Sequence, residues 1–148
     1  MAKLQLRIVT AERELVQQVA DMVIAPGGAG ELGILPRHMP IITTLKAGEL
    51  RVLDGGDQRN YVISGGFMEV RHAEVEAAPG SQVIVLADAA ESAEDIDVER
   101  AEAARRRAEE RLSGKASNID VVRAQASLLR SLARLRAAEN AKNARSRQ

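Results

Sequence analysis

Short runs of alternating apolar and polar residues occupy the chain up to about residue 88. In the first run, residues 4–10, the side chains of Leu4, Leu6 and Ile8 fall on one side, which is the pattern of a half-buried strand. Comparable β-branched runs follow at 22–25, 41–45, 50–53, 60–64, 67–70, 75–78 and 83–87. Turn residues separate these runs, and Asp54-Gly55-Gly56-Asp57 is a strong hairpin signal. Many short strands joined by turns predict an antiparallel β-sandwich or barrel.

The apolar period changes to that of a helix after about residue 90. Every proline lies before residue 89, whereas the later part is rich in Ala, Arg, Glu and Leu. A first helix is expected to start near Ser92 or Asp95, and a second at Asn118. Their predicted apolar stripes are Ala101, Ala104, Ala108 and Leu112 on the first helix, and Ile119, Val122, Ala126, Leu129 and Ala133, widened by Leu128, Leu132 and Leu135, on the second.

These patterns predict an α+β protein with an N-terminal antiparallel β-sandwich and a C-terminal antiparallel two-helix hairpin. The expected division places the sandwich at residues 1–88, the hairpin at 89–141 and a disordered tail at 142–148. The two helices would meet largely through alanine, which buries little apolar area. We therefore expect a hairpin of low stability on its own.

Composition and charge argue against several classes of function. The 21 basic and 21 acidic residues give zero net charge, which a uniformly basic nucleic-acid binder would not have. The chain has no cysteine and only two histidines, so neither a thiolate nor an all-histidine metal site is expected. With one Tyr and one Phe, the chain also lacks the aromatic side chains on which single-stranded nucleic acid stacks.

Motifs for catalysis and for membrane insertion are missing from the sequence. Gly114-Lys115 is followed by Ala116 instead of the Ser or Thr of a phosphate-binding loop, and no Gly-x-Ser-x-Gly occurs. The apolar runs are shorter than the ~20 residues of a membrane span, and the N-terminal segment has no signal-peptide core. We therefore expect a soluble, non-catalytic protein that stays where it is synthesised.

Three segments, in matching order and spacing, resemble the epsilon subunit of F-type ATP synthases. They are GELGILPRHMPIITTLKAGELRV at residues 30–52, ISGGFMEV at 63–70 followed by LADAAE at 86–91, and DIDVERAEAARRRAEERL at 95–112. The resemblance covers nearly the whole chain. It implies a rotor subunit of the central stalk that couples proton translocation to ATP synthesis. It also implies that the C-terminal hairpin inhibits ATP hydrolysis, while catalysis belongs to other subunits.

The resemblance further implies partners and a location. The expected partners are the gamma subunit, the c-ring and the alpha and beta subunits of the catalytic head, with no nucleic acid and no membrane insertion by the chain itself. The implied location is peripheral, on the cytoplasmic face of a bacterial plasma membrane or the stromal face of a thylakoid. A loop at residues 31–40 would lie at the membrane-facing end of the sandwich, where Glu31 and His38 contact the c-ring or the foot of gamma.

No cofactor is required on this interpretation, but ATP is a candidate regulatory ligand. The segment Ile96-Asp97-Val98-Glu99-Arg100-Ala101 matches the motif with which some bacterial members hold ATP on the folded hairpin. By the same resemblance, the predicted ATP-binding residues are Glu91, Asp97, Arg100, Arg107, Arg130 and Arg134. Guanidinium groups from two helices suit a polyphosphate, while a solvated face with intrahelical ion pairs is the alternative role of these arginines.

Two other functions stay open for this sequence. The chain could be a free-standing sandwich that binds a small ligand and carries a helical tail for an unrelated protein partner. Residues 121–148 hold seven basic residues and one acidic residue, so this segment could also touch nucleic acid or acidic lipid.

Overall fold

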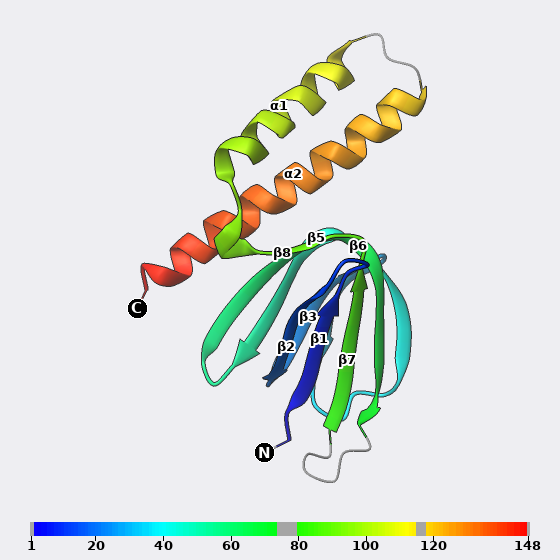
Figure 1. Cartoon of the computed structure of the whole chain (residues 1–148), viewed down its shortest axis with the longest axis vertical. Coiled ribbons are helices and arrows are strands. Elements are labelled where there is room, and N and C mark those ends of the chain that lie inside the picture. Colours follow the sequence, from blue (N-terminus) through cyan, green and yellow to red (C-terminus); the bar gives the residue numbers. More distant parts are fainter. Residues whose placement is uncertain (1, 74–79, 115–117, 148) are drawn as a thin grey trace.

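The chain folds into a β-sheet domain followed by two packed helices. The computed structural model describes residues 2–73, 80–114 and 118–147. Within these residues the strands are β1 (Leu4–Val9), β2 (Glu14–Ala20), β3 (Met22–Gly27), β4 (Gly30–Ile34), β5 (Ile41–Asp54), β6 (Asp57–Ala73), β7 (Gly80–Ala87) and β8 (Ala90–Ser92). A short 3-10 turn, η1 (Ala93–Asp95), leads to the helices α1 (Val98–Ser113) and α2 (Asn118–Arg145). The predicted α+β class is confirmed, and Figure 1 shows the hairpin lying across one end of the sandwich.

The strand order in the sheet is β2-β1-β7-β6-β5-β3-β4, with β8 pairing β6 beyond the end of β7. All of these neighbours are antiparallel except β1 and β7, which are parallel. The predicted antiparallel sandwich is therefore correct apart from this pair. It brings the first strand of the chain beside β7, near the end of the sheet domain. Strand β8 carries the sheet to Ser92, so the sandwich ends later than the predicted boundary at residue 88.

The two longest strands replace four of the shorter ones that the sequence predicts. Strand β5 runs through Gly48 and β6 runs through Gly65 and Gly66, where the sequence pattern indicates breaks. Gly65 and Gly66 have φ values of 110° and 131°, so the strand bends there and continues. A Cβ atom on Gly66 would lie 2.1 Å from the carbonyl oxygen of Leu86, because β6 and β7 approach closely at this bend.

Besides β8, two strands appear where the sequence analysis predicts none. Strand β2 forms an edge of the sheet, and its side chains are mostly exposed or half-buried, which leaves little apolar alternation to detect. Strand β4 occupies Gly30–Ile34 and pairs with β3, so the predicted loop at 31–40 is wrong for its first part. The strand predicted at 75–78 falls outside the described residues.

The core of the sandwich is enclosed by its own strands. The largest fully buried side chains are Leu4, Leu6, Ile8, Val23, Ile34, Leu50, Val52, Ile63, Met68, Val70, Val83 and Val85. They form one cluster to which neither helix contributes. The sandwich therefore has a hydrophobic core independent of the hairpin.

The helices begin and pack differently from the prediction. Asp97, rather than Ser92 or Asp95, caps α1, because its side chain accepts a hydrogen bond from the Arg100 amide. On α1 the predicted positions Ala101 and Ala108 are buried. The second predicted stripe is wrong for Val122, Leu129 and Leu132, which are exposed, although its Ala133 packs at the interface with the sandwich. The fully buried positions of the described α2 are small residues outside the predicted stripe. The buried set is Ala124, Ser131 and Ala137; Val122, Leu129 and Leu132 are 64, 60 and 44% exposed.

The C-terminal segment is also more ordered than predicted. Helix α2 continues to Arg145, so the disordered tail predicted at 142–148 is wrong for residues 142–145. Two contacts explain this order: Asn140 bonds to Glu49 of β5, and Arg145 pairs with Glu94 of η1.

At the N-terminus, the Lys3 ammonium holds Asp21 and Asp54 together beside the β5–β6 turn.

Candidate functional site

Three large apolar side chains lie exposed next to one another on the outer face of the sheet. Strand pairing places Phe67 of β6 opposite Leu86 of β7 on one side and Thr44 of β5 on the other. Ile42 lies two residues before Thr44 and so shares this face. Ile42, Phe67 and Leu86 are 74, 55 and 53% exposed, and we call them the outer apolar row. A group of neighbouring exposed apolar side chains is typical of protein-docking surfaces.

The two residues predicted to contact partners, Glu31 and His38, lie apart: Glu31 is near the start of β4, and His38 follows the strand. Glu31 pairs with Arg51 at 2.8 Å and lines a groove beside α2. His38 lies beyond β4, and its carbonyl oxygen accepts a hydrogen bond from the Ser81 hydroxyl at the start of β7. Figure 1 shows that β7 starts at the end of the sandwich away from the helices. The structure therefore does not bring Glu31 and His38 to one end of the sandwich, because residues 32–34 between them continue β4 as an extended strand.

The six predicted ATP-binding residues come together only in part. Glu91 of β8 and Arg134 of α2 form an ion pair with 2.5 Å between Oε1 and Nε. Asp97 is engaged as the cap of α1. The remaining three, Arg100, Arg107 and Arg130, are exposed, and within the described ranges none of them forms an ion pair.

The sandwich and α2 meet through small side chains and a polar chain. Val62, Ala93 and Ala137 form a small buried cluster, with Ile96, Ala133 and Ala141 packed around it. Beside this cluster Glu49 accepts hydrogen bonds from the side-chain amides of Asn60 and Asn140, at 2.5 and 2.9 Å. Sequence reasoning missed Glu49 and Asn140, because 91 positions separate them and no local pattern links them.

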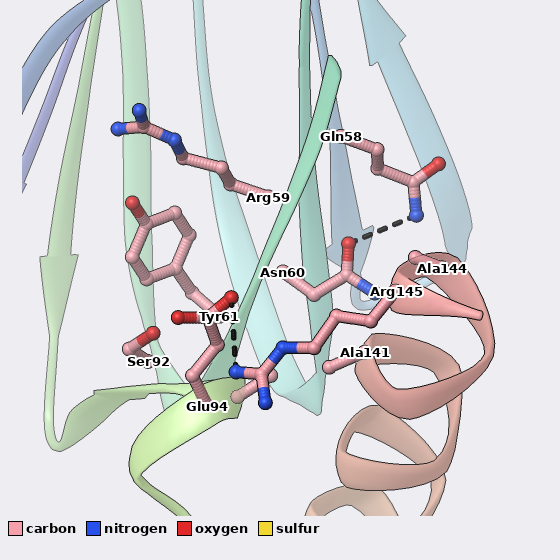
Figure 2. A pocket seen from close by; sticks show the side chains of 10 residues that line it. Gln58, Arg59, Asn60, Tyr61, Ser92, Glu94, Ala141, Ala144 and Arg145 are labelled. Carbon is pink, nitrogen blue, oxygen red and sulfur yellow. Dashed lines mark hydrogen bonds and ion pairs between the residues drawn. The ribbon is translucent and has the colours of Figure 1, made fainter. Parts of the chain in front are cut away.

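A cavity of about 420 Å³ opens where β6, η1 and the end of α2 meet (Figure 2). It is lined by Gln58, Arg59, Asn60, Tyr61, Ser92, Ala93, Glu94, Ala141, Ala144 and Arg145, and so by none of the six predicted ATP-binding residues. Burial raises the pKa of the Tyr61 hydroxyl, so this side chain stays neutral at physiological pH. Across the cavity, Arg145 pairs with Glu94 at 3.2 Å.

The described part of the chain shows neither a metal-binding cluster nor a membrane-spanning helix. No group of three or more His, Asp or Glu side chains there could hold a metal ion. Likewise, no helix among these residues is both long and apolar enough to cross a bilayer.

Family comparison covers both parts of the fold. Residues 3–93 match the beta-sandwich domain of the ATP synthase delta/epsilon chain, and residues 94–139 match its long alpha-helix domain. The chain belongs to the ATP synthase epsilon-chain family. The resemblance on which the sequence analysis relied is thereby confirmed.

Relatives in this family align along most of their length. The chain is 51% identical over 140 residues to the ATP synthase epsilon chain of Desulforamulus reducens, covering 94% of this chain and all of the relative. It is 52% identical over 134 residues to the epsilon chain of Pelotomaculum thermopropionicum, covering 90% of this chain and 94% of that one. Members of the family are non-catalytic subunits of the ATP synthase, as the sequence analysis expects of this chain.

Two solved structures share the fold of the epsilon-chain family seen here. A chain in the mitochondrial ATP synthase of Euglena gracilis, solved with OSCP, F1 and the c-ring, superposes with a TM-score of 0.75 at 23% identity. The match covers 89% of this chain and 79% of that one. A chain of the central stalk and c-ring of the Tetrahymena thermophila mitochondrial ATP synthase superposes with a TM-score of 0.55 at 14% identity, covering 92% and 96%.

Proposed function

We propose that this epsilon-family chain is a rotor subunit in the central stalk of an F-type ATP synthase. There it joins the gamma subunit to the c-ring and helps couple proton translocation to ATP synthesis. It is held peripherally, on the cytoplasmic face of a bacterial membrane, through these partners. Family membership supports this role, and the two structural matches come from ATP synthase assemblies that include the c-ring.

The outer apolar row carries the proposal. Ile42, Phe67 and Leu86 expose large apolar surfaces on three neighbouring strands, although the sandwich core needs none of them. A permanent contact within a rotor needs an interface well above ~1,000 Å² with an apolar centre, and this face supplies such a centre. We assign it to the gamma subunit.

The docking surface is tested by measuring the affinity of the chain for the purified gamma subunit. Phe67→Asp places a charge in the middle of the row and should weaken binding about 30-fold or more, the effect of losing a central contact. Val98→Asp is the matched control. Val98 is 49% exposed at the start of α1, where the helix dipole tolerates an acid. Equal affinities for the two variants would contradict this assignment.

The second part of the proposal is that the hairpin inhibits ATP hydrolysis. We propose that it exchanges between the packed form and an extended form inserted beside gamma in the catalytic head. The small alanine-based contact with the sandwich supports a reversible attachment. Exposed arginines on both helices, including Arg100, Arg107 and Arg130, would pair with acidic surfaces of the alpha and beta subunits. Deleting residues 94–148 should raise ATP hydrolysis by the assembled enzyme without preventing assembly; an unchanged rate would contradict inhibition.

The third part is that ATP stabilises the packed hairpin. Glu91, Asp97, Arg100, Arg107, Arg130 and Arg134 are the proposed contacts. The Glu91–Arg134 ion pair supports this choice, because it already joins β8 to α2 at the proposed site. Binding would favour the packed form by RT ln(1 + [L]/Kd), about 2.7 kcal/mol at a hundredfold excess over Kd.

Calorimetric titration of the isolated chain with ATP tests the nucleotide site. Arg100→Ala and Arg130→Ala should abolish the binding heat, because each removes a charge expected to meet the polyphosphate. Arg106→Ala is the control, because Arg106 is exposed on a different face of α1. No binding heat at millimolar ATP in the unmodified chain would refute this part alone.

A further inference from the structure

The last turns of α2 lie beyond the matched family model and attach to the sandwich. That model ends at residue 139, whereas α2 continues to Arg145. Asn140 donates to Glu49 at 2.9 Å, and Arg145 pairs with Glu94 at 3.2 Å. Ala141 packs against the small cluster at the helix–sheet interface. These last turns therefore form a second attachment of the hairpin, next to the cavity shown in Figure 2.

These contacts extend a regular arrangement along the helix. Arg134, Asn140 and Arg145 each donate to a carboxylate of the sheet domain: Glu91 of β8, Glu49 of β5 and Glu94 of η1. At 1.5 Å per residue, the three donors span roughly 16 Å of α2. Without Asn140 and Arg145, only one of these three contacts, that of Arg134, would remain, and it would hold α2 at a single position.

We propose that residues 140–145 form a clasp that holds the hairpin against the sandwich and sets how often the hairpin detaches. The apolar contact between α2 and the sandwich is small. The polar contacts of the clasp therefore contribute a substantial part of the free energy that favours the packed hairpin over the detached one. An exposed ion pair shifts such an equilibrium about 1.5- to 5-fold, and replacing attraction by repulsion shifts it further. The consequence for ATP hydrolysis rests on the proposed inhibition by the hairpin, whereas the clasp itself does not.

Detachment can be measured with a single introduced thiol, because the chain has no cysteine. Ala137 is fully buried between α2 and the sandwich, so the thiol of Ala137→Cys reacts with a labelling reagent only when the hairpin detaches. Ser131→Cys provides a second reporter. Ser131 is buried one heptad after Ala124, and neither residue belongs to the cluster at the helix–sheet interface, so its labelling reports opening of α2 away from that interface.

The test variant is Arg145→Glu, and the matched control is Lys142→Glu. Lys142 is exposed in the same last turns of α2, so the control makes the same change of charge near the same helix end. Arg145→Glu should speed labelling at residue 137 about threefold or more, while Lys142→Glu changes it little. The exchanged pair, Glu94→Arg with Arg145→Glu, should return the rate towards that of the parent.

Three results at residue 137 would overturn the clasp. They are an unchanged labelling rate at residue 137 in Arg145→Glu, equal rates in Arg145→Glu and Lys142→Glu, or a failure of the exchanged pair to restore protection. An equal acceleration at residue 131 would also overturn it, because the substitution would then loosen the hairpin itself. The experiment uses the isolated full chain without nucleotide, so its outcome is independent of whether the hairpin inhibits hydrolysis.

Discussion

Gly66 is the position where a single methyl group should do most damage to the sandwich. Its φ of 131° is unfavourable for any residue with a Cβ atom, and an added Cβ would lie 2.1 Å from the Leu86 carbonyl oxygen. Relieving that overlap requires β7 to move by roughly 1 Å, which disturbs the pairing of Gly66 with Ala87. Backbone strain of about 1–3 kcal/mol and a similar cost of overpacking give a loss of about 2–6 kcal/mol for Gly66→Ala.

Gly55→Ala is the matched control for this substitution. Gly55 also has a positive φ, of 59°, but an added Cβ there would meet nothing within 4 Å. Only the conformational cost applies, about 1 kcal/mol. Urea unfolding should be followed by the fluorescence of Tyr61, which is the only tyrosine in a chain without tryptophan and lies in the sandwich. Equal losses of unfolding free energy in the two variants would refute the close-contact argument.

Three further predictions address stability and partner contacts. Hydrogen bonds from Lys3 and from the Gly55 amide lower the pKa of Asp21 below its ordinary value of 3.8. The Asp21 carboxylate should therefore stabilise the fold above pH 3.8, and this stabilisation should be lost as the pH falls through the lower folded-state pKa. In urea unfolding, the difference in stability between the parent and Asp21→Asn should shrink over that range, and a constant difference would contradict the prediction. A chain ending at Ala93 should melt cooperatively, because its core contains no hairpin residue, and should be more stable than one ending at Asp88, which lacks β8; loss of the cooperative transition would show a shared core. Glu31→Arg removes the ion pair with Arg51 and should weaken binding to the c-ring more than binding to gamma; equal effects would count against a c-ring contact at this position.

Local sequence patterns predicted most of the strands because each depends on neighbouring residues. Alternation identified β1 and β7, and the paired glycines at 55 and 56 marked the β5–β6 turn, where both have positive φ. The parallel pairing of β1 with β7 could not be predicted in this way, because it joins strands more than 70 positions apart. Gly65 and Gly66 were misinterpreted as a break, because glycine serves equally in a turn and in a bent strand.

The predicted buried face of α2 is wrong at its largest side chains for a physical reason. Hydrophobicity favours the larger side chains, such as Val122 and Leu129, but these are exposed. Close packing against α1 and the sandwich instead selects small residues, such as Ala124 and Ala137, which allow the backbones to approach. The sequence pattern records hydrophobicity and does not record how close two elements come.

The candidate site was only partly accessible from sequence. The resemblance named both Glu91 and Arg134, which meet in the structure although 43 positions separate them. The resemblance also places Glu31 and His38 together in one loop. They lie apart in the structure because Glu31 belongs to strand β4, which the sequence analysis does not predict. Glu49 and Asn140 were not identified, because neither belongs to a motif and their contact depends on where α2 crosses the sheet.

Purification of the tagged full chain from membranes of cells that express it tests the central proposal most directly. After gentle detergent extraction, the alpha, beta and gamma subunits and the c-ring should co-purify with the chain in constant proportion. The Phe67→Asp variant, expressed in the same way, should recover much less of all of them, because the outer apolar row is the proposed attachment to gamma. Recovery of the chain alone, or with unrelated proteins only, would contradict the assignment to the rotor and favour a free-standing binding module.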